Sequence, residues 1–187
     1  MKRIFSLVFA LCLCLSLFTA CNGESGGNAD KTTVSEAEWN AAFLKSNVSI
    51  EGFVTERDQE ESLLMQITES VIHTENDGYE SWVLKQEDGW HFYRDGQVGP
   101  LANGVSASIS YMMQSFHLPG YASFSYNEES GAYVYINEGE SGFYRFDVYF
   151  TGGVIVKIEG YEEEGPVSHL FNFKDYGTTE LQLPNSQ

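Results

Sequence analysis

The four histidines are the residues best suited to metal or acid–base chemistry in this 187-residue chain, yet none stands at a spacing that builds a site. They are His73, His91, His117 and His169. A His-Glu-x-x-His pair would place two imidazoles on one helical face for Zn²⁺, and the sequence contains no such pair. A zinc site would have to be assembled across distant strands, so we predict no metal site.

The sequence also contains no motif for a serine nucleophile or for a calcium site built from carboxylates. Residues 104–108 (GVSAS) lack the closing glycine of a nucleophile elbow, and no convincing strand precedes them. Residues 162–164 (EEE) lack the alternating spacing of a calcium loop and are typical of a solvated turn. No glycine-rich phosphate loop is present. We predict a protein that is not an enzyme, with no catalytic residue and no cofactor.

All three cysteines, Cys12, Cys14 and Cys21, lie in the first 21 residues. Disulfides, cysteine metal clusters and a cysteine nucleophile are therefore excluded beyond them. A short basic start is followed by an uncharged apolar run over residues 4–18, the layout of a bacterial export signal. A retained membrane anchor is the weaker alternative, because the run is short and no basic flank follows it.

Leu17-Phe18-Thr19-Ala20-Cys21 resembles the lipobox of bacterial lipoproteins, departing from it at Phe18, where leucine is usual. The resemblance implies a diacylglycerol on Cys21 and anchoring to the outer face of a bacterial cell membrane, with ordinary cleavage nearby as the alternative. We expect a signal peptide over 1–20, the lipidated cysteine and a flexible linker over 21–32, a folded domain over 33–184 and a tail over 185–187.

The net charge of the chain limits the classes of partner that it can bind. Ten Lys and Arg residues face 27 Asp and Glu residues, a formal charge of −17. A surface this acidic repels phosphate backbones, which excludes nucleic acid as a partner. We expect a monomer.

Two helices are predicted on the folded part. Ser35 and Glu38 form a capping box that begins a helix over 36–45, and Trp39 and Phe43 share one of its faces. The period is helical again over 102–118, where Pro119-Gly120 ends it. The second helix carries an apolar stripe at spacings of 0, 4, 7, 8 and 11, formed by Val105, Ile109, Met112, Met113 and Phe116.

Elsewhere the apolar residues alternate with a period of two, joined by short turns that mostly contain glycine. The expected strands begin near Val48 and continue over 62–76, 79–86, 90–94, 121–128, 132–137, 143–150, 154–161, 167–174 and 179–183. About ten strands and two helices predict an α+β fold. The expected architecture is a single large curled antiparallel sheet, a half-open barrel, with the helices on its concave side.

The apolar stripe of the second helix has two interpretations. It is either simply core, or it lines a cavity, since flexible methionines adapt to varied ligands. The candidate lining residues are Trp39, Phe43, Ile109, Met112, Met113 and Phe116.

The order of these elements, and the terminal residues 173–184 (FKDYGTTELQLP), resemble the LolA/LolB-like lipoprotein superfamily. Its members include bacterial lipoprotein carriers and mycobacterial glycolipid-binding lipoproteins. The resemblance implies a half-open barrel lidded by helices that binds an acyl chain or another apolar ligand. No residue matches a carrier's functional arginine.

The sequence thus supports two hypotheses. The first is an envelope-anchored lipoprotein that binds or shields a lipid-like or other apolar ligand. The second is an interaction module with a filled core, whose acidic face binds a basic protein partner. Salt separates them, because only the second kind of binding collapses as ionic strength rises.

Overall fold

The computed structural model describes residues 33–56, 59–139 and 142–184. The predicted signal peptide, Cys21, the linker and the 185–187 tail lie outside the described residues. Within the described ranges, no helix is both long and apolar enough to cross a membrane.

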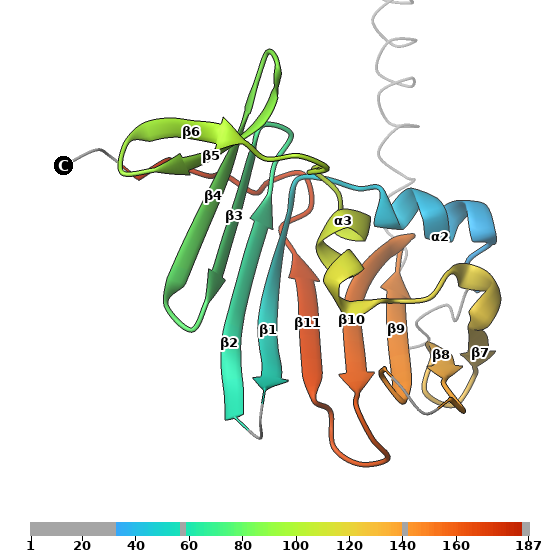
Figure 1. The fold of residues 1–187 in the computed structure, drawn as a ribbon. Helices are drawn as coiled ribbons and strands as arrows, with labels where there is room; N and C mark the ends of the chain where they lie inside the picture. Colours follow the sequence, from blue (N-terminus) through green and yellow to red (C-terminus); the bar gives the residue numbers. More distant parts are fainter. Residues whose placement is uncertain (1–32, 57–58, 140–141, 185–187) are drawn as a thin grey trace, which may run out of the picture. The chain divides into compact units, whose positions relative to one another are not determined.

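Eleven antiparallel strands form a single sheet in the order β6-β5-β4-β3-β2-β1-β11-β10-β9-β8-β7 (Figure 1). Their bounds are β1 Val48–Glu56, β2 Gln59–Ile67, β3 Val71–Asn76, β4 Tyr79–Gln86, β5 Gly89–Arg94, β6 Gln97–Leu101, β7 Ser125–Asn127, β8 Ala132–Ile136, β9 Arg145–Thr151, β10 Val154–Tyr161 and β11 His169–Lys174. The sheet does not close, because β6 and β7 stay at opposite edges. The predicted α+β fold with one large antiparallel sheet is confirmed.

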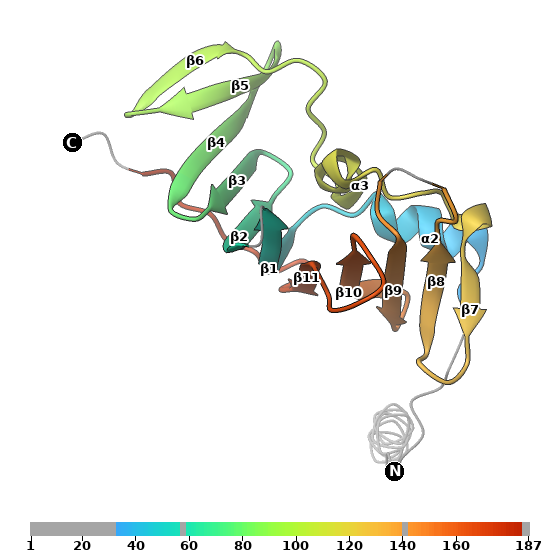
Figure 2. The same cartoon turned by 60° about the horizontal axis from the view of Figure 1, so that its bottom comes forward.

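The sheet curls, and the helices lie on its concave face. Helices α2 (Glu36–Phe43) and α3 (Ile109–Met113) lie on the same side of the sheet, toward which β4, β5 and β6 bend (Figure 2). Two short 3-10 helices, η1 (Gln114–Phe116) and η2 (Tyr121–Ser123), follow α3. The capping box of Ser35 and Glu38 is present at the start of α2.

Asp-Gly turns set the tight hairpins of β3 to β6. Asp77 and Gly78 have φ of 46° and 82°, and Asp95 and Gly96 have φ of 51° and 79°. These left-handed pairs match the twist of the flanking strands, which fixes the register and hence which face each side chain occupies.

A strand predicted over 62–76 is two strands, β2 and β3. The chain reverses at residues 68–70 without glycine or proline, because the Thr68 hydroxyl accepts a hydrogen bond from the Val71 amide at 2.9 Å. The backbone amide of Thr68 also donates to the Val71 carbonyl at 2.8 Å. This side-chain turn is a known alternative to a glycine turn, and the alternation of apolar residues hid it.

The prediction of a last strand over 179–183 is wrong, and β6 was missed. The Thr179 amide donates to the side chain of Asn47 at 2.9 Å rather than joining a strand ladder. β6 contains Pro100, which argues against a central strand but is tolerated at the edge that β6 occupies.

The helix predicted over 102–118 is present only as α3, Ile109–Met113, which is shorter than the predicted apolar stripe. Ser108 is extended, with φ −149° and ψ 153°, and its hydroxyl accepts from the Tyr111 amide, so α3 begins only at Ile109. His117, with φ 54°, ends the helical stretch after η1. Serine competes with helix in this way because its side chain bonds the backbone at caps.

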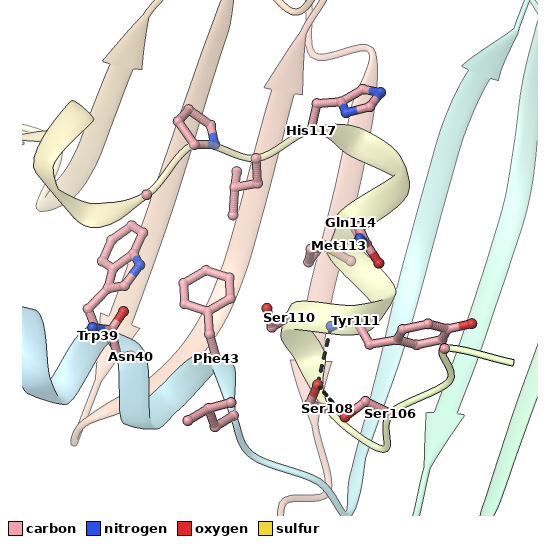
Figure 3. Close-up of a pocket in the computed structure, with 15 residues that line it drawn as sticks. Trp39, Asn40, Phe43, Ser106, Ser108, Ser110, Tyr111, Met113, Gln114 and His117 are labelled. Atoms are coloured by element: carbon pink, nitrogen blue, oxygen red, sulfur yellow. Dashed lines mark hydrogen bonds between the residues drawn. The ribbon is translucent and has the colours of Figure 1, made fainter. Parts of the chain in front are cut away.

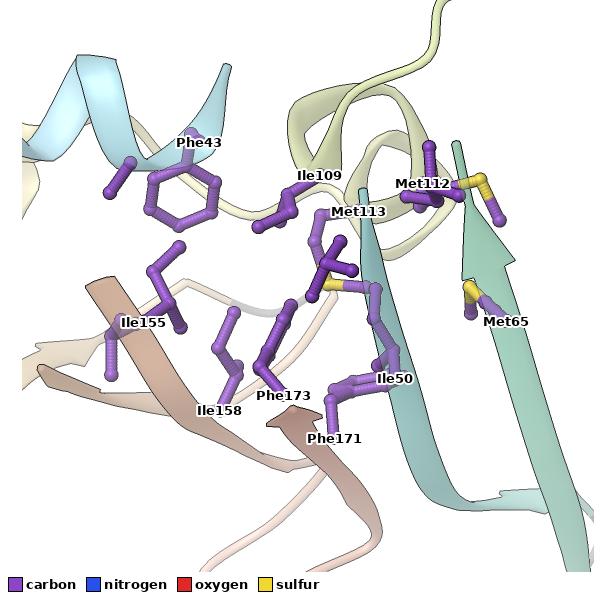
Figure 4. Close-up of a cluster of buried hydrophobic side chains, with 14 of the residues drawn as sticks. Phe43, Ile50, Met65, Ile109, Met112, Met113, Ile155, Ile158, Phe171 and Phe173 are labelled. Carbon is purple, nitrogen blue, oxygen red and sulfur yellow. The ribbon is translucent and has the colours of Figure 1, made fainter. Parts of the chain in front are cut away.

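The core lies between the helices and the concave face of the central strands. Phe171, Ile50 and Ile158 of the sheet are fully buried and lie beneath Ile109 and Met113 of α3 (Figure 4). β1 and β11 approach so closely that a Cβ on Gly52 would lie 1.7 Å from the Leu170 carbonyl oxygen. The centre of the sheet is therefore a packed layer, and open space is found to either side of α3.

Candidate ligand-binding groove

Two hollows flank α3 on the concave face. One, of about 710 Å³, lies between α2 and α3. The other, of about 690 Å³, lies between α3 and the strands β2 to β5, and we call it the groove. Both volumes are within the roughly 300–1,000 Å³ typical of small-molecule sites. The residues that line each hollow therefore determine which is the better candidate for a ligand site.

The hollow between the helices has a mixed surface, in which polar and apolar side chains contribute about equally. Trp39 and Phe43 point toward it from α2, but only 3% and 8% of their surface is exposed (Figure 3). The more exposed side chains around it are the polar Asn40, Ser110 and Gln114 and the apolar Leu44. Two further serines, Ser106 and Ser108, hydrogen-bond to each other, and Ser108 caps α3. The surface of this hollow is more polar than that of the groove, in which apolar side chains predominate.

The groove is lined by alternate residues of four adjacent strands and by α3 and η1. The register places these side chains on one face, because Thr74 pairs with Ser81 and Val83 pairs with Phe92. The lining comprises Leu63, Met65, Ile72, Thr74, Asn76, Ser81, Val83, Phe92, Ala102, Asn103, Val105, Tyr111, Met112, Gln114, Ser115 and Phe116.

The groove is uncharged and partly apolar at its surface. None of the described residues that line it is Asp, Glu, Lys, Arg or His, although the chain carries 37 Lys, Arg, Asp and Glu residues (10 + 27). Phe92 is 48% exposed at its wall, and Val83 and Leu63 are half-buried. An exposed aromatic ring beside other apolar side chains marks a surface suited to an apolar partner.

The six residues predicted to line a ligand site do not share one hollow. Met112 and Phe116 line the groove, whereas Trp39, Phe43 and Met113 border the hollow between the helices. Ile109 is fully buried and lines neither hollow. The two methionines diverge because neighbouring helical residues point about 100° apart, and Met112 turns toward β2 while Met113 turns into the core (Figure 4).

The prediction of lining residues from the sequence included none of the strand residues that line the groove. Thr74, Asn76 and Ser81 stand where the period-two pattern of β3 and β4 would place apolar residues facing the core. Polar residues on the inward face of a strand are a signal of incomplete packing, and that signal is present in the sequence.

On the opposite face of β3 and β4, the structure brings together three potential metal ligands. One ligand atom from each of His73, Glu75 and Glu80 lies within 4.8 Å of the others, because antiparallel pairing sets Glu75 opposite Glu80. These strands are neighbours, not the distant strands that the sequence suggested. An oxygen of Glu80 already accepts from Trp82 Nε1 at 3.2 Å, and exposed carboxylates often gather without an ion. The trio is a weaker candidate than the groove.

The same outer face carries a charge network on β9 and β10. Arg145 Nε donates to the carboxylate of Asp147 at 2.6 Å, and Asp147 is only 2% exposed. Lys157 and Tyr149 both donate to Glu159 at 2.8 Å. Burial raises the pKa of Tyr149, with help from the Glu159 carboxylate. Each acid here has a basic partner, so this network gives the outer face no unpaired acid for a basic partner protein.

His169 makes folding stability sensitive to pH. It lies among the rings of Phe143 and Phe116, at centroid distances of 4.7 and 5.7 Å, and is 5% exposed. Burial lowers its pKa below the ordinary value of 6.5, and the carboxylates of Glu162 and Glu56 oppose this shift only in part. Below pH 6.5 the unfolded chain therefore binds the proton more readily than the folded chain.

We expect the free energy of unfolding to fall as the pH drops below about 6.5 and to be highest above it. His169→Gln should weaken this dependence and leave a remainder due to His73, whose pKa is also lowered by burial. His117→Asn, at an exposed left-handed position that Asn tolerates, is the control for the loss of an imidazole. His91 has the opposite sign, because its bonds to the Gly99 carbonyl and Asp88 raise its pKa. Urea denaturation at pH 7.5 and 5.5 measures how far the free energy of unfolding falls between the two pH values. An equal fall in His169→Gln and in the wild-type chain would show that other groups cause it.

Searches with this chain against protein-family models, curated proteins and solved structures found no match. The resemblance to the LolA/LolB-like superfamily stays a prediction.

Proposed function

We propose that this protein is a non-enzymatic, envelope-anchored lipoprotein that binds a lipid-like or other apolar ligand in the groove. The observation that carries the proposal is the uncharged lining of the groove, with Phe92 48% exposed at its wall. Anchoring at the outer face of a bacterial membrane rests on the lipobox at residues 17–21 and would place the groove close to envelope lipids.

The energetic source of binding is burial of apolar surface. Each methylene of a ligand removed from water contributes about 0.8 kcal/mol, so a medium-length alkyl chain gains several kcal/mol before the cost of its immobilisation. The side chains of Phe92, Val83 and Leu63 gain in the same way, because a ligand would cover surface that they now expose.

Photolabelling of the full chain in membranes of an expressing bacterium tests this proposal. An alkyl probe bearing a diazirine is added, the cells are irradiated, and adducts on the purified chain are located by peptide mass spectrometry. We expect adducts on the groove segments, residues 63–65, 72–83, 92 and 102–116. Adducts confined to segments outside the groove would contradict the proposal.

Salt distinguishes apolar binding from the alternative of an acidic interaction module. Labelling of the groove should change less than twofold between about 0.05 and 0.5 M NaCl, because screening acts on charges and the lining has none. Binding that collapses over this range would favour the acidic face as the functional surface.

A further inference from the structure

One polar atom in the groove lacks the partner that burial demands. The side-chain oxygen Oδ1 of Asn76 is buried and has no hydrogen-bond partner among the described residues. Asn76 lines the groove. Buried acceptors are almost always paired, so an unpaired one at a binding surface indicates a donor that the chain itself does not supply.

The polar side chains of the groove strands gather at one end. Thr74 and Ser81 pair across β3 and β4, and Asn76 follows on the same face just before the Asp77-Gly78 turn. At the other end of these strands, Ile72 pairs with Val83, which in turn pairs with Phe92. Along β3 and β4 the lining therefore changes from hydrogen-bonding to apolar side chains, whereas the β2 part of the lining is apolar throughout, with Leu63 opposite Asn76 and Met65 opposite Thr74.

The lining also restricts the charge of the ligand. None of its described side chains carries a charge that would neutralise a carboxylate, a phosphate or an ammonium group. Placing a charge there would remove it from water without a counter-charge, which is unfavourable. The formal charge of −17 repels anions but attracts cations, so the missing counter-charge alone disfavours a cationic head group.

We infer that the ligand is an uncharged amphiphile whose head group donates a hydrogen bond, from a hydroxyl or an amide N–H, to Asn76. The head lies beside Thr74, Asn76 and Ser81, and the alkyl chain extends toward Val83 and Phe92. This inference rests on the proposed function, which would hold for any apolar ligand.

Three diazirine probes with the same alkyl chain test the inference on the full chain in bacterial membranes. They end in a hydroxyl, a methyl ether and a carboxylate, and groove labelling is normalised to adducts elsewhere on the chain. The hydroxyl probe should label the groove roughly tenfold more than the ether, the ratio that one hydrogen bond to a buried acceptor supplies. The carboxylate should label it least.

Asn76→Leu should bring the ratio of hydroxyl to ether labelling close to one while leaving ether labelling in place. Asn172→Leu is the matched control, because Asn172 is an exposed asparagine on strand β11 that does not line the groove. It should keep the preference for the hydroxyl probe.

Equal groove labelling by hydroxyl and ether probes in the wild-type chain would overturn the inference and leave the proposed function standing. Carboxylate labelling as strong as that of the hydroxyl probe would also overturn it. If none of the three probes labels the groove, the proposed function itself fails. The wild-type comparison decides the matter even if Asn76→Leu does not fold.

Discussion

Replacing Trp39 by alanine is expected to lower the free energy of unfolding by about 4 kcal/mol, a large-to-small core substitution at a site that cannot collapse. Five aromatic rings have centroids within 5.6 Å of the indole. They are Phe43, Tyr121, Phe124, Tyr133 and Phe150. Trp39 thus joins α2 to β8, β9 and η2, and its loss leaves a cavity among rigid rings.

Chemical denaturation followed by circular dichroism measures this loss. Tyr79→Ala serves as the control, because Tyr79 is 83% exposed and its loss should change stability by less than about 0.5 kcal/mol. Trp39 was predicted as a ligand-lining residue. A Trp39→Ala variant of nearly normal stability would contradict the core role described here.

Phe92→Asp is expected to reduce labelling of the groove at least tenfold, with little change in stability. The substitution removes an exposed apolar wall and places an unpaired carboxylate beside the alkyl chain of the ligand, which costs more than 1.4 kcal/mol, the equivalent of tenfold. Because Phe92 is already 48% exposed, the folded chain loses little packing.

Val98→Asp is the matched control for this variant. Val98 lies on the same β5–β6 hairpin and is 50% exposed, but it does not line the groove. Its labelling should match that of the wild-type chain. Equal losses in both variants would show that added charge on the hairpin acts indirectly, and unchanged labelling in Phe92→Asp would remove the groove as the binding surface.

The fold could be predicted largely from local signals. Alternating apolar and polar residues indicate the strands, and a capping box indicates the first helix. Ser35 and Glu38 form the predicted capping box, and the Glu87-Asp88-Gly89 hairpin forms as expected. Two errors in the predicted element boundaries lie where a side-chain hydroxyl hydrogen-bonds the backbone and ends or delays an element. Thr68 turns the chain without glycine, and Ser108 delays the start of α3.

The candidate site could be predicted only in part, because periodicity identifies a buried face without showing which hollow borders it. Met112 and Met113 belong to one predicted stripe, but α3 sits over the sheet so that only Met112 reaches the groove. The strand wall of the groove depends on the curl of the sheet and on long-range pairing, which the sequence does not specify locally.

Native mass spectrometry of the full-length chain from a bacterial host, before and after organic extraction, tests the central claim most directly. The account predicts a bound mass of lipid size that extraction removes, whereas a lipid attached covalently to Cys21 would survive it. The bound species should be uncharged and should be lost in Phe92→Asp. A chain that carries no such mass, and acquires none after incubation with envelope lipids, would contradict the account.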